Sequence, residues 1–129
     1  MTAIENSSEI YFDKDTNVVI MEWRGYANST QFREGTELML NTLILHNTSK
    51  VLANIREMAL IGAEDQEWLG DSFLPRAIRF GFKALAIVKP LSYFNMIAIQ
   101  NIYYKIDREK LVIEFFDTEE EAIKWLKTV

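Results

Sequence analysis

The sequence predicts an α/β protein with one mostly parallel mixed sheet of about five strands, an N-terminal antiparallel hairpin and four helices. Three observations lead to this fold class. Apolar, β-branched runs alternate with stretches of helical spacing after an initial pair of strands. The length of 129 residues suits one domain whose core needs no disulfide or structural metal. Hydrophobic residues form 49% of the chain, which excludes a disordered polyelectrolyte.

The first predicted element is an antiparallel hairpin. A short apolar run over residues 9–13 leads into polar, turn-forming residues over 13–17, and a β-branched run over 18–24 follows. Gly25 interrupts this second run. Two such runs around a short polar loop are typical of a β-hairpin.

A helix and a buried strand should follow the hairpin. Asn28 offers an N-cap side chain, and Gln31 stands three residues later, as in a capping box. Residues at helical spacing then continue to His46. The broad buried side that we expect comprises Phe32, Leu38, Met39, Thr42, Leu43, Ile44 and Leu45. Residues 50–55 are mostly apolar, as in a buried strand, and a right-handed crossover should place them parallel to the preceding strand.

The next predicted helix contains an irregularity. Glu64 and Asp65 place negative charge at its start, where the helix dipole favours it. Pro75 cannot donate a backbone hydrogen bond and clashes with the preceding turn, so we expect a kink or a break between Gly70 and Pro75. The apolar face resumes afterwards, until Gly81 ends it, with Ala77, Ile78 and Phe80.

Two strands and two helices complete the predicted order. Residues 84–88 form the most clearly buried strand, and residues 91–104 are apolar with helical spacing. Residues 111–116 form another strand, and Thr118 with Glu121 makes a capping box that opens the last helix. The inner face of that helix comprises Ala122, Ile123, Trp125 and Leu126.

Three stretches carry a resemblance to a known family of domains. They read Glu22-Trp23-Arg24-Gly25-Tyr26, Glu67-Trp68-Leu69-Gly70 with Phe73-Leu74-Pro75-Arg76, and Phe115-Phe116-Asp117 leading to Ala122-Ile123-Lys124-Trp125-Leu126. With the element order, they resemble the SpoIIAA-like (STAS) domains of anti-sigma-factor antagonists, and more closely the uncharacterised bacterial branch of SpoIIAA-like or STAS/SEC14 domains. The resemblance extends from about Tyr11 to Leu126 and implies a single SpoIIAA-like domain over residues 1–129.

This resemblance implies a regulatory or protein-interaction module rather than an enzyme. Studied members of the family switch partners when a serine at the start of the helix after the third strand is phosphorylated. Residues 60–65 occupy that place here, and no serine or threonine occurs over residues 51–70. Glu64 and Asp65 would also repel an added phosphate. The phosphoswitch is therefore not implied for this chain.

Composition and charge exclude several classes of function. The formal net charge of −5 argues against a nucleic-acid partner, which needs a concentrated basic face. The absence of cysteine excludes disulfides, thiolate metal sites and cysteine nucleophiles. Residues 90–104, the longest uncharged stretch, are too few and too polar to span a bilayer. Residues 1–8 lack the features of a secretory signal, so we expect a cytoplasmic protein.

The residue types that perform catalysis or bind metals have structural explanations in this sequence. His46, the single histidine, lies at a predicted helix end, where it would interact with the helix dipole or the last carbonyls. Acidic residues gather at the starts of two helices, where capping explains them: Glu64, Asp65, Glu67, Asp117, Glu119, Glu120 and Glu121. The glycines lack the spacing of a phosphate-binding loop. We therefore predict no catalytic residue, no metal site and no cofactor.

The candidate binding residues follow from the predicted topology. Ligands of open α/β sheets lie beyond the carboxyl ends of the parallel strands. Those ends supply Arg24, Tyr26, Asn54, Arg56, Glu57, Lys89 and Asp117. Trp68, Arg76 and Arg79 of the irregular helix join these candidates. Arg76, Arg79 and Lys83 form either a solvated face or a small basic stripe for an anionic ligand or an acidic partner segment.

The helix over residues 91–104 leaves two functions open. It holds more aromatic and methionine side chains than one buried face requires, namely Tyr93, Phe94, Met96, Tyr103 and Tyr104. They belong either to the core or to an exposed apolar patch. An exposed patch favours a non-enzymatic interaction module that binds an unknown protein partner, or itself as a homodimer. The alternative is a carrier of a small apolar or amphipathic, lipid-like ligand, with a pocket under the irregular helix near Pro75.

Overall fold

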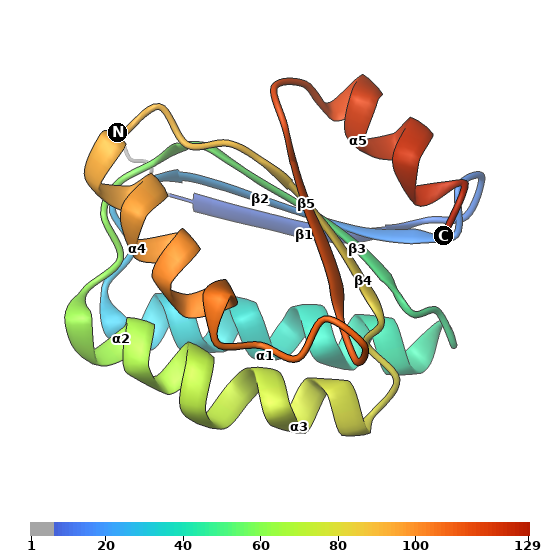
Figure 1. Ribbon diagram of the computed structural model, residues 1–129, viewed down its shortest axis with the longest axis horizontal. Coiled ribbons are helices and arrows are strands. Elements are labelled where there is room, and N and C mark those ends of the chain that lie inside the picture. The colour runs from blue at the N-terminus through green and yellow to red at the C-terminus, as the bar shows by residue number, and fades with distance from the viewer. Residues whose placement is uncertain (1–6) are drawn as a thin grey trace.

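Five strands form one sheet in the order β1-β2-β3-β4-β5 in the computed structural model, which describes residues 7–129 (Figure 1). The strands are β1 (Ser7–Asp13), β2 (Val18–Gly25), β3 (Lys50–Met58), β4 (Ala84–Val88) and β5 (Val112–Phe116). β1 pairs antiparallel with β2, and every other neighbouring pair is parallel. The predicted mixed sheet with an antiparallel hairpin is confirmed. The prediction that residues 1–8 carry no secretory signal falls mainly outside the described residues.

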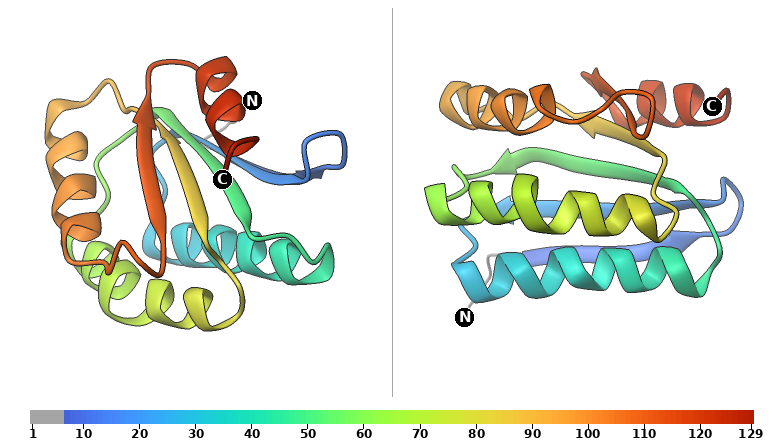
Figure 2. Two further views of the ribbon diagram at one scale, coloured as in Figure 1. Left: turned by 45° about the vertical axis from the view of Figure 1, so that its right-hand side comes forward. Right: turned by 60° about the horizontal axis from the view of Figure 1, so that its bottom comes forward.

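Four helical units connect and follow the strands, as the sequence predicts. Their segments are α1 (Ser29–Leu45), α2 (Ala63–Trp68), the π-helical turn η1 (Leu69–Phe73), α3 (Leu74–Arg79), α4 (Tyr93–Tyr104) and α5 (Glu119–Leu126). The segments α2, η1 and α3 run on without a break as one composite helix beside α1 (Figure 2). The predicted capping box of Asn28 and Gln31 opens α1, and Thr118 caps α5.

The sheet separates two apolar clusters of unequal size. The larger cluster lies between the sheet and α1, the composite helix and α4, whereas the smaller one lies under α5. Figure 1 shows α5 on one side of the sheet and α1 with α3 on the other. Side chains of β2 alternate between the two clusters, since Val19 and Met21 face the larger and Val18 and Ile20 face the smaller.

The irregularity expected between Gly70 and Pro75 is a π-helical turn that leaves the helix continuous. The Leu74 N–H donates to the carbonyl of Leu69, five residues earlier. This wider turn places Pro75 in the first turn of α3, where its missing N–H costs little. The helix therefore continues past Pro75 through one wider turn instead of ending there.

α1 turns a narrower side to the core than the sequence predicted. Its buried residues are Phe32, Gly35, Thr36, Met39, Leu40 and Leu43. The prediction was wrong for Leu38, Ile44 and Leu45, which are exposed because one helix packed on a sheet buries only a single stripe. Gly35 allows the close approach of α1 to β2, since a Cβ there would lie 2.6 Å from Cη2 of Trp23.

The end of α3 differs from the prediction, whereas the end of α1 agrees with it. Phe80 is exposed although we expected it on the inner face, because it follows the last turn of α3 and the chain then turns at Gly81 (φ 109°). Phe82 is buried in the larger cluster in its place. His46 stands at the end of α1, as predicted, and its ring stacks on Phe12 with centroids 4.1 Å apart.

Candidate functional site

The carboxyl ends of β3, β4 and β5 bring several predicted site residues together. Lys89 Nζ lies 2.8 Å from Asp117 Oδ1, and the hydrogen bond from Lys89 is the main reason that the pKa of Asp117 is lowered, with a smaller contribution from Arg56. Asn54 Nδ2 donates to Glu119 Oε2 at 2.7 Å. These polar groups are thus paired with one another, and they join the sheet to the start of α5.

Three other predicted residues lie nearby on β2 and β3. Arg24 Nη2 forms an ion pair with Glu22 Oε2 at 3.0 Å on its own strand, and Glu57 stands opposite Arg24 in the strand register. Tyr26 follows β2 and is exposed. The structure therefore places them at the predicted edge, with Arg24 held by Glu22.

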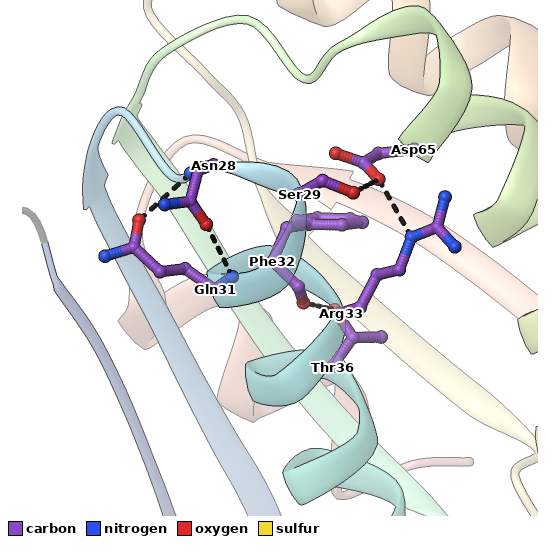
Figure 3. A network of polar contacts seen from close by, with 7 residues as sticks. All are labelled: Asn28, Ser29, Gln31, Phe32, Arg33, Thr36 and Asp65. Atoms are coloured by element: carbon purple, nitrogen blue, oxygen red, sulfur yellow. Dashed lines mark hydrogen bonds and ion pairs between the residues drawn. The ribbon is translucent and has the colours of Figure 1, made fainter.

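Asp65 joins the start of α1 to α2 (Figure 3). Its side chain is buried, and Oδ1 accepts hydrogen bonds from Ser29 Oγ at 2.7 Å and from Arg33 Nε at 3.0 Å. The guanidinium of Arg33 also lies 5.1 Å from the centre of the Trp68 ring. Trp68, a predicted binding residue, therefore packs under Arg33 and helps to hold α1 against the composite helix.

The structure divides the basic residues that the sequence placed in one stripe. Arg76 forms a two-pronged ion pair with Glu37 of α1, which lowers the pKa of Glu37 through the hydrogen bonds. Arg79 and Lys83 form no ion pair within residues 7–129. Arg76 thus joins α3 to α1, whereas Arg79 lines a groove at the surface.

Arg79 lines an open groove between the composite helix and the segment after α4. The groove has a volume of about 530 Å³ and is lined by Gly70, Asp71, Pro75, Ile78, Arg79, Lys105, Ile106, Asp107 and Lys110. An adjoining hollow of about 230 Å³ shares Gly70, Asp71 and Lys105 with it. Lys105 and Lys110 were not among the predicted site residues, because they lie in a segment without helical or strand periodicity.

The outer side of α4 is apolar and exposed. Tyr93, Ile97 and Tyr104 fall at helical intervals of four and seven residues, so they share one side of the helix with the neighbouring Phe94. Tyr93 and Phe94 are each 71% exposed and Tyr104 is 87% exposed. We call these four residues the α4 outer face. Of the aromatic residues that the sequence left open on this helix, only Tyr103 belongs to the buried core.

Among the described residues 7–129, the cavity in the core is smaller than a lipid-like ligand would need. The cavity under the composite helix has a volume of about 40 Å³ and is lined by core side chains such as Trp23 and Phe73. Ligand pockets usually measure about 300–1,000 Å³. The cavity therefore does not favour the carrier that the sequence left as an alternative.

The described residues show neither a metal-binding cluster nor a membrane-spanning helix. Within residues 7–129, no group of three or more histidine, cysteine, aspartate or glutamate side chains is placed to hold a metal ion. Among the helices of those residues, none has the length and apolar character to cross a bilayer.

Comparisons with known proteins identify the fold. A crystal structure from Shewanella loihica PV-4, of an uncharacterised protein of the DUF3478 family with a SpoIIAA-like fold, matches this chain with a TM-score of 0.65. The two sequences are 19% identical, and the match covers 98% of each chain. No family model and no curated protein matches the sequence. The chain therefore has the SpoIIAA-like fold that its sequence motifs suggested.

Proposed function

We propose that this chain is a cytoplasmic, non-enzymatic module that acts through protein–protein contacts, and that the α4 outer face is its contact surface. The supporting observation is the exposure of three aromatic rings and Ile97 on one side of a helix that carries no charged residue. Apolar patches of this kind on soluble domains commonly mark interaction sites. The non-enzymatic part is supported by the lack of cysteine and by the stacking of the single histidine, His46, on Phe12.

The size of the patch supports a specific interface. Tyr93, Phe94 and Tyr104 expose 71%, 71% and 87% of their surface, which at about 200 Å² per aromatic side chain amounts to ~450 Å². A standard interface buries about 800 Å² on each partner. Three rings would thus supply about half of one side, and the remainder would come from neighbouring groups such as the exposed Leu91.

The charge distribution favours a second copy of this chain as the occupant. Residues 90–104 carry no charge, whereas the whole chain has a net charge of −5. Two copies that meet through α4 bring together a helix without charged residues, whereas contacts between two acidic surfaces would be repulsive. A patch that contacts itself around a two-fold axis is also the commonest arrangement of homodimers. The proposed assembly is therefore a symmetric dimer with α4 at its centre.

The test compares two substitutions in size-exclusion chromatography with light scattering and in sedimentation equilibrium. Phe94→Glu should raise the dimer dissociation constant at least about a hundredfold, because the symmetry buries two unpaired carboxylates. Leu45→Glu is the matched control, since Leu45 is 78% exposed at the end of α1, outside the α4 outer face.

Leu45→Glu should leave the dissociation constant unchanged. A wild-type chain that stays monomeric at millimolar concentration would contradict the dimer. Equal effects of Phe94→Glu and Leu45→Glu would contradict the assignment of the contact to α4.

A further inference from the structure

The groove between the composite helix and the segment after α4 has the features of a ligand site. We infer that it binds a small amphipathic anion, in which an acidic head group is attached to an apolar body. This inference does not depend on self-association through α4. It rests on the charges, the apolar side chains and the helix geometry of the groove.

Three cations line the groove: Arg79, Lys105 and Lys110. None of them forms an ion pair within residues 7–129, although four other cations do: Arg24, Arg33, Arg76 and Lys89. The groove therefore gathers three of the fourteen cations of a chain whose net charge is −5. Positive charge from two separate segments therefore converges on one concave surface, where it favours an anion.

The two acidic residues of the groove do not cancel this charge. Asp107 Oδ1 accepts a hydrogen bond from the Glu109 N–H at 2.9 Å, so this carboxylate stabilises the turn that carries Lys110. Asp71 is the other carboxylate of the lining. With three cations and two anions, the groove keeps a net positive charge.

The remaining lining is apolar and suits the body of the ligand. Pro75, Ile78 and Ile106 are partly buried and line the groove beside the cations. Transfer of an alkyl or aryl group from water onto such side chains is favourable in proportion to the area buried. The groove thus combines a site for a charged head with a surface for an apolar body.

The π-helical turn contributes residues to the wall of the groove. The Leu74 N–H donates to the Leu69 carbonyl in the i to i+5 register of this turn. In the same register, the donor to the Gly70 carbonyl would be the backbone N–H of residue 75, which is a proline and has none. Gly70, which belongs to this turn, lines both the groove and the adjoining hollow. Turns of this type occur frequently at functional sites.

The probe for the test is octyl phosphate, used below its micelle-forming concentration and followed by ¹⁵N-resolved NMR. The amide of Gly70 is the reporter in the groove, and the amide of Gly35, which lies in α1, is the internal reference. The Lys105→Gln/Lys110→Gln double variant removes two cations of the groove. Lys124→Gln/Lys127→Gln is the control with the same change of net charge at α5 and the residue after it.

We expect a saturable shift of the Gly70 resonance and an affinity at least about tenfold lower in the groove variant. The control variant should bind within about twofold of the wild type, and added salt should weaken binding. Inorganic phosphate and octanol should each bind at least about tenfold more weakly than octyl phosphate, since each offers half of the ligand. The Phe94→Glu variant should bind octyl phosphate as the wild type does, which separates this test from the dimer test.

Three results would overturn the inference. They are the absence of a saturable shift at Gly70, equal affinity in the groove variant and the wild type, and binding of octanol as tight as that of octyl phosphate. Sedimentation with vesicles of phosphatidylglycerol and phosphatidylcholine distinguishes the source of the anion. Pelleting that requires Lys105 and Lys110 identifies a lipid head group as the source, and protein that stays in the supernatant identifies a free amphiphile.

Discussion

The helices α4 and α5 differ in what they present to solvent, although each follows a parallel strand and begins at a hydroxyl N-cap. The outward residues of α5 include Glu119, Glu120, Glu121 and Lys124, and its inner side is anchored by Ala122 and Leu126. The outward residues of α4 include Tyr93, Phe94, Ile97 and Tyr104. The fold requires only the inner side of each helix. The apolar outer side of α4 is therefore not explained by the packing within this chain, and we propose a contact with another molecule as its role.

The largest predicted difference in stability is between two side-chain truncations, one on the inner side of α5 and one on the outer side of α4. Leu126→Ala should lower the free energy of unfolding by about 2–5 kcal/mol, because Leu126 is fully buried on the inner side of α5. Tyr104→Ala on α4 should change it by less than about 0.5 kcal/mol, because the ring is exposed. Urea denaturation of dilute protein, followed by tryptophan fluorescence, measures both without a contribution from self-association. Similar losses in the two variants would show that the outer side of α4 serves the fold.

A smaller effect is expected at the starts of the two helices. Asn95 of α4 is fully buried, and its Oδ1 accepts the Ile61 N–H at 3.3 Å, so Asn95→Ala should cost about 1–2 kcal/mol. Thr118→Ala removes the N-cap of α5, which accepts the Glu121 N–H, and should cost about 1 kcal/mol. The same denaturation experiment applies, with Gln100→Ala on the exposed side of α4 as the neutral control. A cost at Gln100 equal to that at Asn95 would argue against the buried hydrogen bond as the cause.

The difference between α4 and α5 also explains which parts of the fold could be predicted from the sequence. In α5, charged residues occupy one side of the helix and apolar residues the other, so the sequence predicts both the exposed side and the buried side. In α4, apolar residues occur on all sides, and the pattern allowed either a core helix or an exposed patch. The strands were predictable for a similar reason, since β4 is bounded by polar and turn residues and is buried throughout.

The candidate site was harder to predict because its contacts join residues that are far apart in the chain. The helical spacing placed Arg76 on one basic stripe with Arg79, but Arg76 pairs with Glu37, which lies 39 residues earlier. Arg79 meets Lys105 and Lys110 only because the segment after α4 lies beside α3. The carboxyl ends of the strands were located correctly from topology. The sequence did not show that Lys89 and Asp117 would be paired with each other there.

The smallest predicted effect concerns the charged junction between the sheet and α5. The hydrogen bond from Lys89 is the main cause of the lowered pKa of Asp117, so Lys89→Gln should raise this pKa towards the usual aspartate value of about 3.9. A carboxyl whose pKa is lower in the folded state stabilises the fold above its unfolded pKa, and this contribution disappears as the pH falls through the folded value. The wild type should therefore be slightly more stable than Lys89→Gln at neutral pH, and the two should converge in acid. The difference is small because the ion pair is screened by solvent.

NMR titration of the Asp117 carboxyl carbon measures the shift of the pKa directly, with Lys124→Gln as the control on α5. An unchanged midpoint in Lys89→Gln would show that this ion pair does not lower the pKa of Asp117.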